Sequence, residues 1–385
     1  MPVLTAKKGF LYIALLIVLL LPVLPLLPGG LSAIAASVGF DLMDKSGLTI
    51  TLSPIDPTVR EMSADPSNRL ILEVSVKDSD GKPVKGARIS LKVDKGRGSL
   101  IPAGPATDSD GKLLAQYSPP FLDEDTFGKG KPVVNLTAGI PGGGMVSEFL
   151  LTLTRKPVVF VPGYQATPEI FSSMKEYLES RGFVTAGLSY ASDKGVAAGA
   201  AELGSFIDNF RGELRTKGIQ ADRVDIVAHS MGGLVARYYT CDTGYPAKSD
   251  VDKIIFVSVP QMGSPIATLG LEYYSDQGIR DLIPDSTLYT GQFPSLINGG
   301  LNSSIQVGSM LGQYDEVVTP ESASLESWGI RTEMFDVGDS NFTVDKLLSG
   351  KLVEAANHKV VLYNRTVFRR VEEMLGSVLS YPVKK

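Results

Sequence analysis

Ser230 lies in the segment 228–233, with the sequence Ala-His-Ser-Met-Gly-Gly. A short apolar run precedes this segment, and a helix is predicted over 234–240. A nucleophile at such a junction occupies a sharp turn that exposes its oxygen above the sheet. The strand and the helix approach closely there, so small residues such as Ala228 and Gly232 must flank the serine. A helix-capping serine is the alternative, but the preceding strand and the two small residues favour a nucleophile.

A nucleophilic serine needs a base, and the chain contains two histidines, His229 and His358. His229 is adjacent to Ser230 inside the turn, so its side chain should point away from the seryl oxygen. His358 comes late in the chain, after the last predicted strand and before the last predicted helix. Elimination and position therefore favour His358 as the base over the alternative of an ordinary surface histidine.

The sequence around Ser230 resembles bacterial lipases and esterases of the α/β-hydrolase superfamily, especially small secreted lipases with alanine in the first glycine position of Gly-x-Ser-x-Gly. The resemblance covers roughly residues 156–380. It includes a Pro…Gly-Ser segment at 257–265 and a short insertion at 281–298 that could shape an acyl pocket or a lid. It implies a serine hydrolase that cleaves carboxylic esters through an acyl-enzyme, without a cofactor.

The resemblance also implies that the catalytic residues follow the order serine, aspartate, histidine. Residues 312–318 read Gly-Gln-Tyr-Asp-Glu-Val-Val, similar to the superfamily's Gly-x-x-Asp-x-x-Val segment. Asp315 is therefore expected to accept the Nδ1–H of His358, to fix its tautomer and to stabilise the imidazolium. Glu316 and Asp339 are the competing carboxylates. Without this order, Asp315 would be an ordinary turn residue.

The oxyanion of a tetrahedral intermediate needs hydrogen-bond donors. Met231, the residue after the nucleophile, is expected to donate its backbone N–H. A second donor, the N–H of Tyr164, is expected from the loop Pro162-Gly163-Tyr164. Many members of the superfamily have His-Gly in this loop, whereas this chain has Pro-Gly. A backbone donor does not need that histidine, although a simple turn also explains the loop.

Residues 156–385 alternate between strands and helices, which predicts a mostly parallel sheet with helices on both faces. The unbroken apolar run 158–161 suits a strand that is buried on both faces. Further strands are predicted at 184–190, 224–228, 251–259, 304–311 and 332–337, and longer helices at 168–181, 195–217 and 360–379.

Residues 48–154 show period-two alternation of apolar residues, interrupted by turns rich in Gly, Pro and Asp. This pattern predicts an antiparallel β-sandwich. The segments 76–87 and 107–112 resemble bacterial immunoglobulin-like repeats of the invasin and intimin type, which implies a spacer or a module for a cell-surface or matrix ligand. Both contain Asp-Ser-Asp-Gly-Lys. Calcium loops would need a distal bidentate Glu that is missing, so calcium is unsupported and tight turns explain the motif better.

The N-terminus predicts export. Lys7 and Lys8 precede an apolar run at 10–21, and residues 33–35 have the spacing of a signal-peptidase site. The segment 1–36 is therefore a cleaved signal peptide or a retained membrane anchor, because its apolar run is long for the first and marginal for the second. In either case, we expect the domains outside the cytoplasm, secreted or anchored to the membrane.

Composition narrows the function classes. The net charge is −5 and there is no basic stripe, which argues against nucleic acid as a partner. Cys241 is the only cysteine, so an intrachain disulfide is excluded, a His/Cys zinc site is not expected, and the thiol is interpreted as core packing.

The leading interpretation is a lipase or carboxylesterase that acts on an ester or lipid substrate. One alternative is a surface adhesion protein in which the hydrolase domain is secondary. The other is a lipid acyltransferase or deacylase that acts close to its own membrane anchor. Acyl length, the alcohol moiety and interfacial activation are left open by the sequence.

Overall fold

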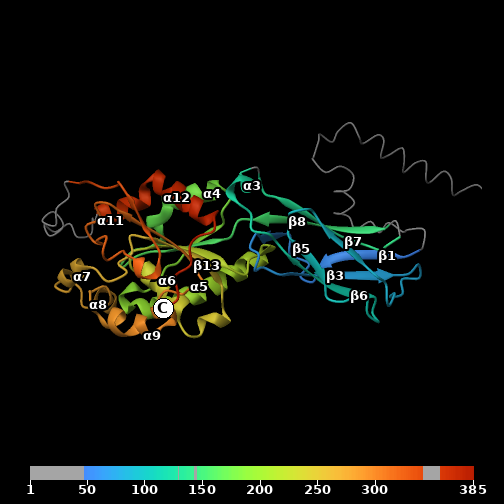
Figure 1. Ribbon diagram of the computed structural model, residues 1–385, viewed down its shortest axis with the longest axis horizontal. Coiled ribbons are helices and arrows are strands. Elements are labelled where there is room, and N and C mark those ends of the chain that lie inside the picture. The colour runs from blue at the N-terminus through green and yellow to red at the C-terminus, as the bar shows by residue number, and fades with distance from the viewer. Residues whose placement is uncertain (1–46, 129, 143–144, 341–355) are drawn as a thin grey trace, which may run out of the picture.

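The chain folds into a β-region and an α/β-region that follow one another along the long axis of the molecule (Figure 1). The computed structural model describes residues 47–128, 130–142, 145–340 and 356–385. The segment 1–36, predicted to be a signal peptide or an anchor, lies outside the described residues. Within these ranges, no helix has both the length and the apolar character to cross a membrane.

The β-region consists of two sheets whose facing sides share one core. The strand orders are β1-β3-β6-β5 and β11-β2-β8-β7-β4. The elements from this part of the chain are β1 (Thr49–Pro54), β2 (Glu61–Ser63), β3 (Leu70–Lys77), β4 (Ser90–Val93), β5 (Ser99–Pro102), β6 (Lys112–Ser118), α3 (Glu124–Phe127), β7 (Val133–Gly139) and β8 (Val146–Thr154). Leu72 of one sheet and Leu136 of the other are fully buried in this core, as period-two alternation predicts. The immunoglobulin-like assignment of this region stays a prediction.

Pairing in the β-region is antiparallel apart from β2, which runs parallel to β8. The prediction of a purely antiparallel region was therefore wrong at this strand. The chain crosses from β1 to β2 through a turn at 55–60 and enters the second sheet in the same direction as β8, which leads out of the region.

The two Asp-Ser-Asp-Gly-Lys segments form tight turns, as expected. Oδ1 of Asp78 accepts hydrogen bonds from the backbone N–H groups of Asp80 and Lys82, at 3.0 and 2.9 Å. Asp108 makes the same two bonds to the residues two and four positions later, both at 2.9 Å. These carboxylates therefore close the turns through the backbone.

The α/β-region is built on a six-stranded, fully parallel sheet with the order β10-β9-β12-β13-β14-β15. Its strands are β9 (Val158–Val161), β10 (Thr185–Gly187), β12 (Val224–His229), β13 (Val251–Val257), β14 (Gln306–Gly312) and β15 (Thr332–Phe335). Its helices are α4 (Ser172–Ser180), α5 (Val196–Thr216), α6 (Met231–Cys241), α7 (Pro265–Gly270), α8 (Gln277–Asp281), α9 (Phe293–Ser295), α11 (Ala356–Val360) and α12 (Arg365–Leu375).

Helices cover both faces of this sheet, as the alternating pattern predicted. Successive strand residues point to opposite faces, so β9 contributes Val159 and Val161 to the core under α5 and α6, and Val158 and Phe160 to the core under α4 and α12. In Figure 1, α4 and α12 lie on one side of the sheet and α5, α6 and α9 on the other. All four β9 residues are buried, which explains the unbroken apolar run.

The C-terminal helical segment differs from its prediction. In place of one helix over 360–379, the chain forms α11, a 3₁₀ turn at Val361–Tyr363 and then α12. The side chain of Asn364 accepts a hydrogen bond from the N–H of Thr366 at 2.8 Å, which caps a new helix start. The remaining strands and helices lie within a few residues of their predicted positions. Cys241 is buried, as expected for a packing residue.

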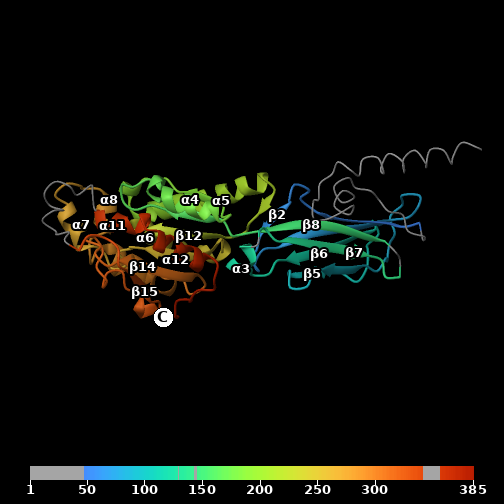
Figure 2. The ribbon, with the colours of Figure 1, turned by 90° about the horizontal axis from the view of Figure 1, so that it is seen from above.

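The two regions share a sheet. The short strand β11 (Ile219–Gln220), which precedes β12, pairs in parallel with β2 of the β-region. The carbonyl of Gly218 accepts hydrogen bonds from the N–H groups of Arg60 and Glu61, at 2.9 and 3.0 Å. Figure 2 shows β2 at this junction. The β-region is therefore docked against the α/β-region through backbone pairing.

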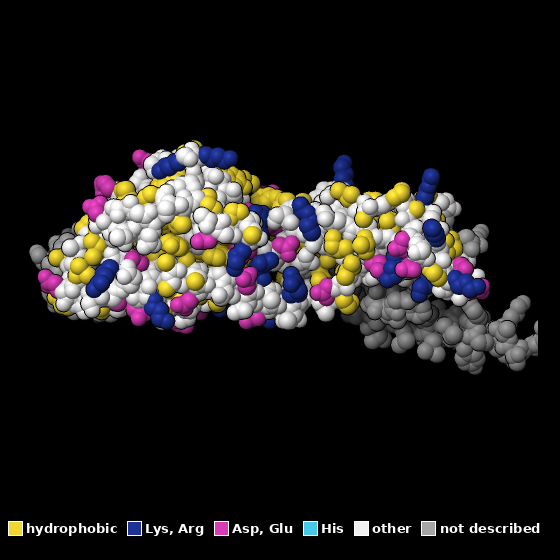
Figure 3. All heavy atoms as spheres, turned by 90° about the horizontal axis from the view of Figure 1, so that it is seen from below, with side chains coloured by type: hydrophobic (Ala, Val, Ile, Leu, Met, Phe, Trp, Pro, Cys, Tyr) yellow, Lys and Arg dark blue, Asp and Glu magenta, His cyan; other side chains and the backbone are white. Residues whose placement is uncertain are grey.

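The surface seen from below carries Lys and Arg side chains interspersed with Asp and Glu over both regions (Figure 3). Hydrophobic side chains are also distributed over this face. Neighbouring charges of opposite sign cancel over short distances, so this face has no extended region of one sign.

Candidate active site

The candidate site lies at the carboxyl end of the parallel sheet. From β9 the chain moves outward to β10 and then returns to place β12 on the other side of β9. Ligands of open α/β sheets bind beyond the carboxyl ends of the strands at such a reversal. Gly163 follows β9 here, Ser230 follows β12, and Asp315 comes shortly after β14.

Ser230 occupies a strained turn between β12 and α6. Its φ is 53° and its ψ is −131°, a conformation that non-glycine residues rarely adopt. Gly232 makes the turn possible, because a Cβ there would lie 2.3 Å from the carbonyl oxygen of Val161 and 2.4 Å from that of Pro162. The local conformation is the one expected of a nucleophile held above the sheet.

The loop after β9 packs directly against the nucleophile. A Cβ on Gly163 would lie 2.8 Å from Cβ of Ser230 and 3.3 Å from its Oγ, so this position requires glycine. Met231, the first residue of α6, is completely buried. The structure thus brings together the two segments predicted to supply the oxyanion donors, the loop with Tyr164 and the start of α6. Donation by their N–H groups stays a prediction.

The imidazole of His358 is hydrogen-bonded to Asp315. Nδ1 of His358 lies 3.0 Å from Oδ1 and 2.9 Å from Oδ2 of the carboxylate. Asp315 is itself held by the N–H groups of Val317 and Val318, which donate to Oδ1 at 2.9 and 2.8 Å. The side chain of Asp315 is fully shielded from solvent and that of His358 nearly so. The structure therefore brings together the predicted base, His358, and its predicted carboxylate partner, Asp315, which are 43 residues apart in sequence.

Asp315 is held in its charged form. Burial by itself would raise the pKa of this carboxyl, but the facing His358 imidazole and the hydrogen bonds that Asp315 accepts hold the pKa below its ordinary value. A carboxylate can only accept hydrogen bonds, so His358 carries its proton on Nδ1 and leaves Nε2 unprotonated in the neutral ring. Nε2 is the nitrogen that a general base needs.

The two competing residues, Glu316 and Asp339, make their hydrogen bonds beside the His358 ring and not to it. Oε2 of Glu316 accepts a hydrogen bond from the backbone N–H of His358 at 3.0 Å. Asp339 exchanges backbone hydrogen bonds with the side chain of Asn357, which precedes the base. Asp315 is thus the carboxylate at the imidazole ring.

Sequence reasoning missed the role of the second histidine. His229 is buried, and its Nε2 lies 2.9 Å from the backbone carbonyl oxygen of His358. The two rings are 4.5 Å apart between centroids. Burial lowers the pKa of His229 to about 3, so this ring stays neutral. Its adjacency to Ser230 excluded it as a base but gave no sign that it reaches His358.

A cavity of about 220 Å³ opens at Ser230 and His358. Its walls are mostly apolar and include Tyr164, whose hydroxyl donates to Oδ2 of Asp276 at 2.5 Å. The other apolar residues that line it are Ala166, Ile170, Pro260, Ile266, Ala267, Tyr274, Ile279, Leu282 and Val317. The insertion predicted at 281–298 contributes only Leu282. α7, α8 and the segment between them contribute Ile266, Ala267, Gly270, Tyr274 and Ile279.

A larger cavity of about 490 Å³ lies at the junction of the two regions, lined by Arg155, Arg181 and Glu372 among others. It contains none of the residues around Ser230. The smaller cavity is the candidate site because it alone, of these two, combines a strained serine with a hydrogen-bonded His–Asp pair. In the described part of the chain, no group of His, Cys, Asp and Glu side chains could hold a metal ion.

A family model described as "PGAP1-like alpha/beta domain" matches residues 206–337, which include Ser230 and Asp315 and end before His358. No curated protein matches the chain.

Among solved structures, the mature lipase BlEst2 of Bacillus licheniformis is similar at 14% identity and a TM-score of 0.44, over 58% of this chain and 93% of that one. Lipase B of Aspergillus fumigatus is similar at 18% identity and a TM-score of 0.40, over 59% and 54%. The D00–D0 domain of intimin is similar at 15% identity and a TM-score of 0.23, over 29% and 50%.

These similarities are distant, and the argument for the fold comes from the sheet itself together with the family match. A parallel sheet with helices on both faces and a strained serine after a central strand are both present. The α/β-region of this chain is therefore an α/β-hydrolase-like domain.

Proposed function

We propose that this chain is a serine hydrolase that cleaves carboxylic esters with Ser230 as nucleophile, His358 as general base and Asp315 as its carboxylate partner. One observation carries the proposal: at one cavity, a serine in a positive-φ turn lies with a histidine whose Nδ1 is hydrogen-bonded to a buried carboxylate. A structural serine or a surface histidine would need neither the strained turn nor the buried ion-pair partner.

The proposed reaction has two halves. Oγ of Ser230 attacks the ester carbonyl while Nε2 of His358 removes its proton, and the protonated imidazole then gives that proton to the leaving alcohol. Water, activated by the same nitrogen, releases the acyl group from the serine. Backbone N–H groups of Met231 and Tyr164 would stabilise the oxyanion, a contribution of roughly 10²–10³-fold in rate per donor.

The cavity favours an ester with a compact apolar acyl group. At about 220 Å³ the cavity is smaller than the roughly 300–1,000 Å³ of pockets that hold drug-sized ligands. Ile170, Ile266 and Ile279 would contact this chain, and burying each methylene contributes about 0.8 kcal/mol. Short to medium acyl chains are therefore the expected substrates.

The site lies at the end of the α/β-region that is remote from the β-region. Helices α7 and α8, which line the cavity, lie at this far end in Figures 1 and 2. The β-region is docked through β11 and lies between the site and Gly47, the first described residue. It is therefore well suited to act as a spacer. We further propose that the protein is exported, with the site outside the cytoplasm.

The experiment is a p-nitrophenyl ester series from acetate to palmitate with the purified chain lacking residues 1–36. We expect the highest kcat/KM at or below about eight acyl carbons, and a loss of roughly 10³-fold or more in Ser230→Ala. Ser205→Ala, an exposed serine on α5, is the matched control and should keep full activity. Full activity in Ser230→Ala would overturn the proposal. Product analysis with added alcohols distinguishes hydrolysis from acyl transfer, and absence of turnover on all esters would favour an adhesion role.

A further inference from the structure

We propose that Glu316 and His229 are positioning residues that hold the backbone of His358 from its two sides and so aim its imidazole at Ser230. The inference rests on the proposed function, because it assigns how the base of that reaction is held. It concerns two side chains that the reaction scheme itself does not use.

The need for outside partners follows from the helix that carries the base. His358 lies in α11, whose described residues are Ala356–Val360. The last four carbonyl groups of a helix have no partner within it, and because α11 ends at Val360 the carbonyl of His358 is one of these. Side chains from other elements can therefore bind the backbone of the base and orient it.

Glu316 supplies the partner on the amide side. Its Oε2 accepts the N–H of His358 at 3.0 Å, and Glu316 directly follows Asp315, which holds the ring. Consecutive residues of one turn therefore contact the same histidine at its ring and at its backbone. The turn is itself fixed by the hydrogen bonds from Val317 and Val318 to Asp315.

His229 supplies the partner on the carbonyl side. Because the carbonyl oxygen of His358 can only accept, the facing Nε2 of His229 must carry the proton and donate it at 2.9 Å. A neutral ring with its proton on Nε2 has none on Nδ1, and deep burial keeps this ring neutral. His229 adjoins Ser230 in sequence, so this hydrogen bond ties the nucleophile turn directly to the residue that carries the base.

Three contacts thus fix His358: Asp315 at Nδ1, Glu316 at the N–H and His229 at the carbonyl. They come from the last residue of β12 and from the turn after β14, both at the carboxyl edge of the sheet. A displacement of about 1 Å at a reacting group can cost about 10²-fold in rate. Releasing the backbone of His358 should therefore lower kcat and leave substrate binding almost unchanged.

The test compares variants that remove each contact with variants that restore it. Glu316→Leu and His229→Leu should each lower kcat about 10- to 100-fold, with KM changed less than about twofold. Glu316→Gln keeps a side-chain oxygen acceptor, and His229→Gln keeps an N–H donor of similar reach. Both should recover most of kcat. Thermal unfolding of each variant accompanies the kinetics, and only variants folded at the assay temperature are compared.

A second readout does not depend on turnover. The Nδ1–H proton of His358, shared with Asp315, gives a proton NMR signal far downfield, and it should shift or broaden in the Leu variants and return in the Gln variants. Unchanged kcat and an unchanged signal in both Leu variants would overturn the inference. If Ser230→Ala retained full activity, the proposed function would fail instead. If Ser230→Ala lost its esterase activity while Glu316→Leu and His229→Leu both kept full activity, only the positioning role would be overturned.

Discussion

The junction between the two regions allows burial and geometry to be separated as causes of ion-pair stability. Arg223, just before β12, donates to Asp65 of the β-region through Nε at 2.8 Å and Nη2 at 2.6 Å. Arg370 on α12 donates to Glu333 through the same two nitrogens at the same distances. The pairs differ in exposure: 23% and 0% for Arg223 and Asp65, against 36% and 33% for Arg370 and Glu333. The perturbation is Arg→Met at each position, which keeps an apolar stem and removes the charge.

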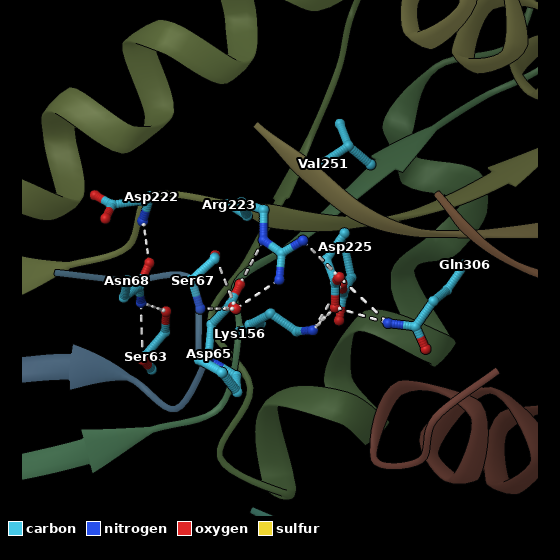
Figure 4. A network of polar contacts seen from close by, with 12 residues as sticks. Ser63, Asp65, Ser67, Asn68, Lys156, Asp222, Arg223, Asp225, Val251 and Gln306 are labelled. Carbon is cyan, nitrogen blue, oxygen red and sulfur yellow. Dashed lines mark hydrogen bonds and ion pairs between the residues drawn. The ribbon is translucent and has the colours of Figure 1, made fainter. Parts of the chain in front are cut away.

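The surroundings of Asp65 determine how much free energy of unfolding is lost in Arg223→Met. Figure 4 shows Arg223 beside Asp65, with Lys156 and Asp225 in the same polar network. Removing one partner of a buried pair costs about 3–5 kcal/mol, because the other charge stays buried without compensation. Asp65 would keep hydrogen bonds from the N–H and hydroxyl of Ser67, both at 2.9 Å. Asp252, which Arg223 also contacts at 2.8 Å, would keep its ion pair with Lys156, so the lower end of this range, about 3 kcal/mol, is expected. For the exposed pair, solvent screening limits the loss to about 1 kcal/mol.

Urea and thermal unfolding of the two variants measure this difference. At roughly 2–4 °C per kcal/mol for a domain of the size of the α/β-region, Arg223→Met should lower Tm by about 6–12 °C and Arg370→Met by no more than about 4 °C. Ester hydrolysis at 25 °C should stay at the wild-type rate in Arg223→Met, because Arg223 lies at the opposite end of β12 from Ser230. If Arg223→Met lost no more free energy of unfolding than Arg370→Met, the reasoning would be refuted. The hydrogen-bond geometry, which the two pairs share, would then explain their stability without burial.

Three further predictions concern single positions. Gly232→Ala would place a Cβ against two backbone carbonyls, so it should lower the free energy of unfolding by about 1–3 kcal/mol or more and abolish most of the esterase activity. Gly212→Ala, in an open position on α5, should raise the free energy of unfolding by about 0.5–1 kcal/mol, and urea titration measures both changes. Gly270→Val narrows the cavity beside Ile279 and should move the optimum of the ester series to shorter acyl chains, and an unchanged optimum would contradict the cavity assignment. Burial raises the pKa of Asp225 to about 6, so the folded state binds its proton more tightly than the unfolded state does. The stability of the wild type relative to Asp225→Asn should therefore be highest near pH 4 and fall as the pH rises through 6, and a pH-independent difference would contradict this.

The sequence by itself determined the strand-turn-helix around Ser230 and the alternating pattern of the α/β-region. Both are local properties: the small residues that permit the turn lie within one six-residue segment, and the periodicity of each strand or helix can be read within its own length. His358 followed from the presence of only two histidines and from its position, and Asp315 from the resemblance of residues 312–318 to a segment of the α/β-hydrolase superfamily. The break in the last helix is also local, and the capping Asn364 is the signal that could have placed it.

Only the tertiary structure decided which groups surround His358, which residues line the cavity and how the two regions join. Glu316 and His229 reach the backbone of His358 across 42 and 129 positions, and neither contact follows from residue type or spacing. Residues of α7 and α8 line the cavity together with the loop after β9 and the turn after β14, and β11 pairs with a strand more than 150 positions earlier. Such contacts depend on how sheets and turns pack in three dimensions. A linear pattern specifies which face of an element is buried but not which partner will bury it.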